Sequence, residues 1–227
     1  MSRIVVYPVA EPLRNLVRGY WFVEDWKGTH DGRPIVTGPN SGAIITINFG
    51  RPNAMIGGPL APRVSFLGPQ TGVRQWRSWP ETYFAMAMLT ACGMARLFPG
   101  VGPVALNGLV ELAAITGQQR ADAFADGLDP RWPWERIVPL LDRRLIERLE
   151  TVKAPDHFSD LAAACALLKN GHQVNDVALH LGAGRRQLHR WFRHQVGMGP
   201  KQFMDLERLQ RSLGAMQGNS GDPVEGL

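Results

Sequence analysis

Glycine and proline interrupt residues 1 to about 105 at short intervals, whereas the apolar residues beyond about 106 recur with the period of a helix. Short apolar runs between turn residues are typical of antiparallel β structure, and spacings of three and four residues are typical of amphipathic helices. The chain is therefore predicted to be an α+β protein. We expect an N-terminal antiparallel β barrel or sandwich with flanking helices, followed by an all-α C-terminal unit.

Five segments of the N-terminal part have the character of strands. In the second, Ile45, Ile47 and Phe49 share one face, which is the period-2 pattern of a half-buried strand. The fifth is apolar on both faces and is expected to be central. The segments are Arg18 to Glu24, Ala43 to Phe49, Arg63 to Leu67, Val73 to Trp79 and Tyr83 to Leu89.

Two helical stretches are expected next. Asn107 is suited to cap a helix that contains Leu109 and ends at Gly117. The pattern is helical again over residues 134–149, but a proline inside a helix removes a hydrogen bond and clashes with the preceding turn. The stronger helix of this stretch is therefore expected to start near Pro139.

A short segment around Lys153-Ala154-Pro155 has the composition of a linker. It is expected to divide the chain into a β-rich N-terminal domain with a helical end (1–152) and an all-α C-terminal domain (157–217). The last residues, 218–227, are rich in glycine and polar residues and are expected to form a disordered tail.

Three helices are expected after the linker. The first has four apolar residues at helical spacing: Leu161, Ala164, Cys165 and Leu168. The second runs from Asn175 to Leu181, and after a turn with two glycines the third runs from Arg185 to Val196. A short helix, a tight glycine-containing turn and a basic helix together form the sequence pattern of a helix-turn-helix.

The third of these helices is strongly basic. Between Arg185 and Lys201 there are five Lys or Arg side chains and no carboxylate, which equals the net charge of +5 of the whole chain. One stripe is apolar and is expected to face the other helices: Leu188, Trp191, Phe192 and Val196. The opposite stripe would project into the DNA major groove, about 12 Å wide, and is predicted to read base edges: Arg186, His189, Arg190 and Arg193. Three further residues are predicted to contact the DNA backbone: Arg185, His194 and Lys201.

Other interpretations stay open. A helix with one apolar and one basic stripe is commonly a solvated surface helix. A second alternative is a non-enzymatic small-molecule sensor whose C-terminal unit is a degenerate DNA-binding remnant. A third is a cupin-like enzyme, which would need several histidines on its strands, yet only His30 of the six lies in the N-terminal part. We therefore expect no enzymatic activity, no metal and no cofactor.

The C-terminal motif resembles the first half of the AraC/XylS-type DNA-binding domain. The resemblance covers residues 158–217 and is carried by the following residues: Ala178, Leu181-Gly182, Leu188, Phe192, Gly197, Pro200, Phe203, Arg208 and Leu209. It implies a transcription regulator in which Arg186, His189 and Arg190 read bases and Gly197-x-x-Pro200 opens a long linker helix. It also implies double-stranded DNA as the partner.

The resemblance extends to the N-terminal part and has two departures. Gly19-Tyr20-Trp21, Asn48-Phe49-Gly50 and the segment from Leu67 to Thr71 are similar to the β-rich domain that some of these regulators carry. Gly184 stands where the family commonly has a serine cap, and the sequence after Met216 shows no second helix-turn-helix. We therefore expect a truncated relative whose single chain binds DNA weakly, so that tight binding would need two chains, as in a homodimer.

The remaining expectations concern environment and ligands. Two cysteines 73 residues apart, Cys92 and Cys165, lack metal-ligand spacing and are expected to be small buried apolar groups in a reducing compartment. With no signal-peptide pattern and no apolar run of membrane-spanning length, a cytoplasmic location is expected. A small-molecule effector would bind in the N-terminal domain, where four tryptophans are candidates for a pocket wall or for the core: Trp21, Trp26, Trp76 and Trp79.

Overall fold

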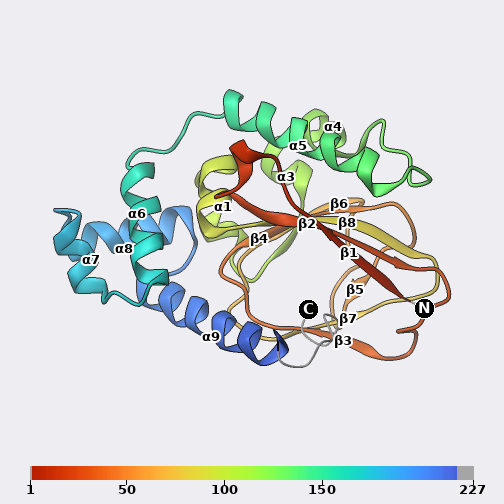
Figure 1. Cartoon of the computed structure of the whole chain (residues 1–227), viewed down its shortest axis with the longest axis horizontal. Coiled ribbons are helices and arrows are strands. Elements are labelled where there is room, and N and C mark those ends of the chain that lie inside the picture. Colours follow the sequence, from red (N-terminus) through yellow and green to blue (C-terminus); the bar gives the residue numbers. More distant parts are fainter. Residues whose placement is uncertain (1, 219–227) are drawn as a thin grey trace.

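The computed structural model describes residues 2–218, which form two antiparallel sheets and a set of helices (Figure 1). The larger sheet has the strand order β1-β2-β8-β4-β6-β9 and the smaller one β3-β7-β5. The strands are β1 (Arg3–Tyr7), β2 (Val17–Asp25), β3 (Pro34–Thr37), β4 (Ala43–Asn48), β5 (Ala54–Met55), β6 (Val64–Leu67), β7 (Arg74–Arg77), β8 (Thr82–Leu89) and β9 (Leu109–Glu111).

The five strands expected from the sequence are β2, β4, β6, β7 and β8. The strand that is apolar on both faces, β8, pairs with β2 on one side and with β4 on the other, so its central position is confirmed. The four short strands β1, β3, β5 and β9 were not expected, and all of them lie at sheet edges. Edge strands bury less of their surface, which explains why their apolar pattern is weak.

The two sheets face each other, but they do not close into a barrel. The larger sheet ends at β1 and β9, and the smaller sheet lies below it in Figure 1. A barrel or a sandwich was expected, and the structure is an open sandwich of two layers.

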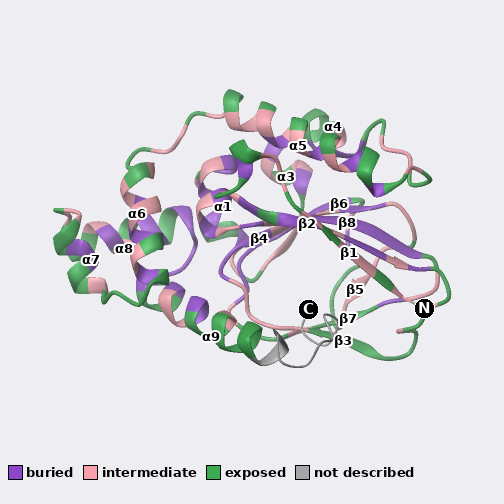
Figure 2. Cartoon of the chain, in the orientation of Figure 1, coloured by how far each residue is buried: buried purple, intermediate pink, exposed green. Residues whose placement is uncertain are grey.

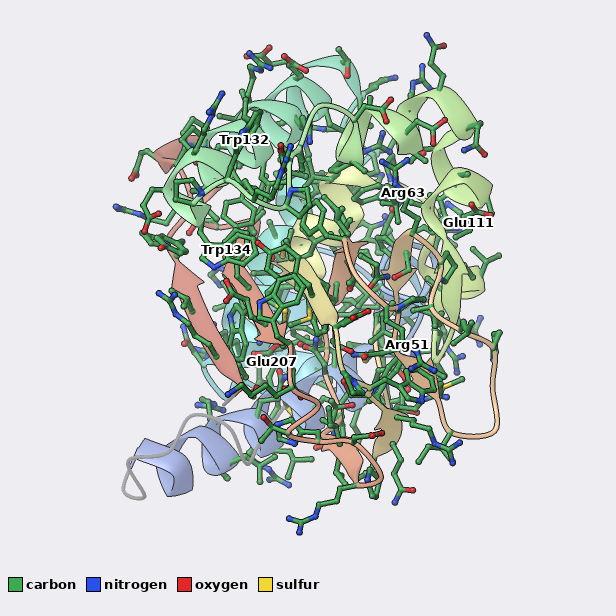
Figure 3. All side chains as sticks on the ribbon, turned by 90° about the vertical axis from the view of Figure 1, so that its right-hand side faces the viewer. Arg51, Arg63, Glu111, Trp132, Trp134 and Glu207 are labelled. Carbon is green, nitrogen blue, oxygen red and sulfur yellow. The ribbon has the colours of Figure 1, made fainter. Side chains whose placement is uncertain are left out.

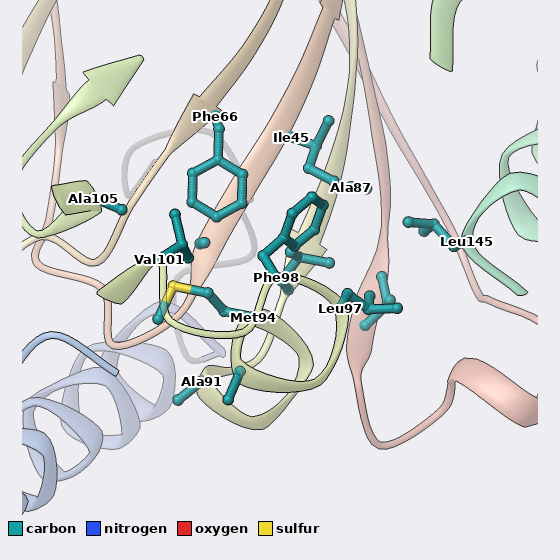
Figure 4. Close-up of a cluster of buried hydrophobic side chains, with 14 of the residues drawn as sticks. Ile45, Phe66, Ala87, Ala91, Met94, Leu97, Phe98, Val101, Ala105 and Leu145 are labelled. Carbon is teal, nitrogen blue, oxygen red and sulfur yellow. The ribbon is translucent and has the colours of Figure 1, made fainter. Parts of the chain in front are cut away.

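The core fills the face of the larger sheet that points away from the smaller one. Ile45 and Ile47 of β4 are 2% and 3% exposed, as their alternation predicts. They belong to the same core cluster as Phe66 of β6 and Phe98, which Figure 4 shows together with Ile45. The rings of Phe66 and Phe98 meet edge to face at 5.0 Å. Helices cover this face, and Figure 2 shows the burial concentrated along the central strands and the inner sides of the helices.

The helices in the order of the chain are η1 (Glu11–Leu13), α1 (Ala91–Leu97), α2 (Gly102–Ala105), α3 (Leu112–Thr116), α4 (Gln118–Ala125), α5 (Trp134–Thr151), α6 (Phe158–Lys169), α7 (Val174–His180), α8 (Arg185–Gln195) and α9 (Pro200–Gly218). None of the helices within residues 2–218 is long and apolar enough to cross a membrane.

The helix expected after Asn107 is shorter than predicted. Asn107 has a positive φ of 57° and does not cap a helix, and Leu109 lies in β9, where it pairs with Leu67 of β6. Only Leu112–Thr116 is helical, and the predicted end at Gly117 is correct, with φ 82°. A free edge on β6 recruits the start of this segment as a strand, which its local sequence does not reveal.

The prediction that a helix starts near Pro139 is wrong. α5 runs without interruption from Trp134 to Thr151 with Pro139 inside it. The proline removes the hydrogen bond that would reach the carbonyl of Glu135, and Pro139 is exposed, so water can satisfy that carbonyl. Trp134 and Ile137, both buried, hold the first turns of the helix in the core.

The helices α6 to α9 form the C-terminal part, and the first three of them match the sequence closely. On α6 the predicted stripe of Leu161, Ala164, Cys165 and Leu168 is buried throughout. The hydrophobic core runs without a break from the sheet through α1 to these helices. The proposed division of the chain at residues 152–157 therefore crosses a shared core and stays a prediction. The expected tail lies outside the described residues, apart from Gly218 at the end of α9.

Candidate functional site

The segment from α7 to α8 has the local structure of a helix, a tight turn and a second helix. α7 ends after His180, and Gly182 takes a left-handed φ of 60°, which glycine adopts without steric cost. The amide of Ala183 donates to the carbonyl of Ala178 at 3.0 Å and so closes the end of α7. Gly184 then starts α8 in extended conformation, without a side-chain cap.

The inner face of α8 is apolar, as the sequence predicts. Leu188, Phe192 and Val196 are fully buried, and Trp191 is 9% exposed. The ring of Phe192 lies 5.4 Å from that of Phe203 on α9, so the inner face also anchors the next helix. Because these side chains cannot turn outward without losing their packing, the opposite face of α8 must point to solvent.

The outer face of α8 carries the positive charge. Three of the residues expected to read bases, Arg186, Arg190 and Arg193, are exposed, and so is Arg185. Within residues 2–218, none of these four side chains is paired with a carboxylate. Four guanidinium groups with their donors directed to water form a surface suited to phosphate and to guanine edges.

The histidines of α8 lie in different surroundings from the arginines. His189 is half-buried, and its ring is close to Gly199, where an added Cβ would lie 3.4 Å from the imidazole. His194 is exposed and lies beside Gly100 in the loop that follows α1. His194 thus sits at the boundary between α8 and the β-rich part, a position the sequence did not indicate.

Lys201, the other residue expected at the DNA backbone, is exposed in the first turn of α9. Its Nζ lies 3.7 Å from the carboxylate of Asp205, one turn further along the helix. The Lys201 side chain is 74% exposed and that of Asp205 44%, so this ion pair is weak and leaves the lysine available.

The far end of α8 is fastened to the β-rich part through backbone contacts. The Gln195 side chain accepts a hydrogen bond from the amide of Gly100 at 3.0 Å. Gly197 and Gly102 approach so closely that a Cβ on Gly197 would lie 2.3 Å from the Gly102 carbonyl oxygen. This contact fixes the orientation of α8 relative to the sheets.

A cavity of about 510 Å³ lies between the two sheets. Its upper wall is the second face of the larger sheet, whose apolar side chains form a separate cluster: Val23, Phe84, Met86, Ile4, Trp21, Ile44 and Met88. Trp76 of β7 lines it from the opposite side, and Gln210, Leu213 and Gly214 of α9 line one end. The volume is within the range of small-molecule sites, about 300–1,000 Å³.

Only two of the four candidate tryptophans belong to this cavity. Trp21 and Trp76 line it. Trp26 is 57% exposed and stacks on Tyr83 at 5.3 Å, whereas Trp79 lies under the guanidinium of Arg51 at 4.6 Å.

A polar network joins the α9 end of the cavity to the sheet. Glu207 is only 5% exposed, although it is a carboxylate, and it lies where α9 meets the strands (Figure 3). The hydroxyl of Ser41 donates to Glu207, and Arg18 approaches the same carboxylate oxygen at 3.4 Å. Gln210 donates to the side chain of Asn40 at 3.1 Å. This network was not expected from the sequence, because its members are up to 189 positions apart and form no motif.

The other end of the cavity contains Asp25 and His30. Asp25 is 1% exposed, and its carboxylate accepts the amides of Thr29 at 2.8 Å and His30 at 3.3 Å. Burial acts to raise the pKa of Asp25, but these hydrogen bonds outweigh it and hold the pKa below its ordinary value. Among the described residues no group of three or more His, Cys, Asp or Glu side chains could hold a metal ion.

The geometry defines an α+β protein with an open antiparallel β-rich part, a cavity and a helix-turn-helix unit.

No family model matches the chain, and neither does any curated protein. Two solved structures are similar to the chain at low identity and low TM-score. ToxT from Vibrio cholerae O395 is 9% identical with a TM-score of 0.36, and the match covers 96% of this chain and 82% of that one. The AraC-like transcriptional activator CuxR is 12% identical with a TM-score of 0.26, over 93% and 86% of the two chains. Both likenesses are too weak to assign a function to this chain.

Proposed function

We propose that this chain is a sequence-specific transcription regulator of the AraC type that binds double-stranded DNA through α8. The observation that carries the proposal is the outer face of α8, where Arg186, Arg190 and Arg193 are exposed together on a helix whose opposite face is buried. A basic helix that is merely solvated needs no short helix and tight turn before it, whereas a DNA-reading helix of the helix-turn-helix type has both. The α7–turn–α8 segment supplies both.

The side chains have different roles in this proposal. α8 enters the major groove, and its outer stripe contacts base edges, with arginine donating two hydrogen bonds to guanine. The base-reading residues are Arg186, His189, Arg190 and Arg193. The residues at the margins of the helix neutralise phosphates and set the register on the duplex, and they are Arg185, His194 and Lys201.

The test is selection of duplexes from a random pool, followed by titration of the selected and a scrambled duplex at several salt concentrations. Arg190→Ala is expected to weaken binding to the selected duplex by about 1–3 kcal/mol and to reduce its preference over the scrambled one. Arg14→Ala is the control, because Arg14 is also an exposed arginine but follows η1 in the β-rich part, outside the α7–turn–α8 segment. If the wild-type chain enriches no sequence and binds neither duplex at low salt, the proposal fails.

A second candidate function, the sensing of a small molecule, is favoured by the cavity of about 510 Å³. We propose that it takes a mainly apolar effector, since most of its wall is the apolar face of the larger sheet. Residues 1–152 would then act as the sensor and residues 157–217 as the DNA-binding unit. Because α9 lines the same cavity as the two sheets, residues of both parts would contact a bound effector.

Thr46 offers a direct test of the cavity. It lies half-buried on β4 and faces the cavity, so Thr46→Trp would fill part of the space. We expect this variant to lose the thermal stabilisation that a compound library reveals for the wild-type chain, while Ile56→Trp, at an exposed position outside the cavity, keeps it. Ligand binding without DNA binding would favour a sensor that has lost its DNA function.

One helix-turn-helix covers about one major-groove turn, so tight binding calls for two copies. We propose that the chain binds as a homodimer to half-sites separated by a helical repeat of about 10 bp. Sedimentation of the protein with duplexes carrying one or two half-sites tests this. A single copy on both duplexes would contradict it.

A further inference from the structure

The two cysteines, far apart in sequence, meet where the β-rich part contacts the C-terminal helices. Cys92 lies on α1 and Cys165 on the buried stripe of α6, and these two helices pack against each other. Both cysteines belong to the same hydrophobic cluster, and their side chains are close enough to interact. Both were expected to be small buried apolar groups, because their spacing matches no motif, but only Cys165 is buried.

The two thiols differ in access. Cys165 is 5% exposed, whereas Cys92 is only half-buried at the edge of the core. A small oxidant arriving from solvent therefore meets Cys92 first. Cys165, directly behind it, is placed to react with whatever forms on the Cys92 sulfur.

The surroundings also distinguish the two groups chemically. The interaction with the Cys165 side chain and the nearby charge of Lys169 lower the pKa of Cys92, and they outweigh the opposing effects of burial and of Glu207. The same interaction and burial raise the pKa of Cys165 well above its ordinary value. Since the thiolate is the reactive form, Cys92 is the better nucleophile of the pair.

We propose that Cys92 and Cys165 form a peroxide-sensitive dithiol whose oxidation links α1 to α6 through a disulfide. In the first step the Cys92 thiolate attacks a hydroperoxide, the O–O bond breaks, and Cys92 becomes a sulfenic acid as hydroxide or alkoxide leaves. In the second step the Cys165 sulfur attacks the Cys92 sulfur, an S–S bond forms, and the sulfenic oxygen leaves as water. For hydrogen peroxide, two thiols and one peroxide give one disulfide and two waters.

The consequence is a covalent tie across the interface that holds the C-terminal helices. α6 is the first helix of the C-terminal part, which contains α8, and α1 follows directly after the central strand β8. In the reduced protein only non-covalent packing joins them. This inference depends on the contact of the two thiols and not on DNA binding.

The experiment treats the reduced full-length chain with hydrogen peroxide, counts its thiols after denaturation and maps the linked peptides by mass spectrometry. We expect two reactive thiols per chain to fall to none, an intramolecular Cys92–Cys165 link, and a higher midpoint of thermal unfolding that a reductant reverses. Linked chains, or irreversible oxidation without the intramolecular link, would overturn the proposal. The proposal would also be overturned if the folded chain kept both thiols at a peroxide concentration that oxidises the unfolded chain.

Two variants separate the roles of the cysteines. In Cys165→Ser the sulfenic acid on Cys92 has no partner, and dimedone is expected to trap it. In Cys92→Ser the buried Cys165 is expected to keep its thiol under the same treatment. Equal reactivity of the two variants contradicts the assigned order of attack. If either variant fails to fold, the peptide map of the wild-type chain decides by itself.

Discussion

Gly197 lies against Gly102 at the junction of α8 with the β-rich part, and a Cβ on Gly197 would come within 2.3 Å of the Gly102 carbonyl oxygen. Gly197 also has a φ of 84°, a conformation that other residues adopt only with strain. Two separate reasons therefore require glycine at this position, one from the local turn and one from the tertiary contact.

Gly197→Ala is expected to lower the free energy of unfolding by about 2 kcal/mol or more, through the strained φ and the displaced contact. Gly182→Ala is the matched control, because Gly182 has a φ of 60° but nothing within 4 Å of an added Cβ. It should lose only the conformational part, about 1 kcal/mol. Urea unfolding of both variants measures the difference, and equal losses would show that the contact with Gly102 is unimportant.

Leu188→Ala and Phe192→Ala are each expected to cost about 2–5 kcal/mol, since both side chains are fully buried and truncation leaves a cavity. The control is Leu179→Ala on α7, where the side chain is 82% exposed and should matter little. Thermal and urea unfolding provide the measurement. Wild-type stability in the two α8 variants would mean that the inner face of α8 is not packed as described.

Glu207→Ala is expected to destabilise the chain by about 1–3 kcal/mol, because it removes the carboxylate that accepts from the buried Ser41 hydroxyl and lies beside Arg18. The nearest acceptor left to both groups is the side-chain oxygen of Gln210 at 3.4 Å. Asp205→Ala, two residues earlier, removes only an exposed ion pair with Lys201 and should cost at most about 0.5 kcal/mol. Chemical unfolding at neutral pH compares the two. A larger loss in Asp205→Ala would be inconsistent with the network.

The hydrogen bonds to Asp25 predict a pH dependence of stability. The pKa of Asp25 is lowered in the folded chain, so its contribution is present above the unfolded value of about 3.9 and is lost as the pH falls through the lower folded pKa. We expect the stability difference between the wild type and Asp25→Asn to shrink as the pH falls from 5 toward 2. Urea unfolding across this range tests it, and a constant difference would show that the charge of Asp25 does not contribute.

Lys201→Ala is expected to weaken binding to all duplexes alike and to lower the slope of log affinity against log salt by about one unit, since one phosphate contact is lost. Arg190→Ala should instead act mainly on the preferred duplex. Fluorescence anisotropy at several salt concentrations separates the two effects. A sequence-dependent loss in Lys201→Ala would place this lysine at a base and not at the backbone.

The bounds of α7 and α8 could be predicted from the sequence to within one residue at each end. α8 buries Leu188, Trp191 and Phe192 as its period requires, and the turn at Gly182 follows from a glycine placed at a helix end. The central strand β8 was equally clear, because a strand that is apolar on both faces has few other places in a sheet. In these segments the local pattern and the tertiary environment agree.

The tertiary structure alone decided where distant segments meet. Leu109 became a strand because β6 offered a free edge, and Pro139 stayed inside α5 because Trp134 and Ile137 are anchored in the core. Three further features leave no periodic signal in the chain. They are the Glu207 network, the wall of the cavity on α9 and the meeting of Cys92 with Cys165. Periodicity records which face of an element is buried, whereas the partner that buries it is chosen by the packing of the whole chain.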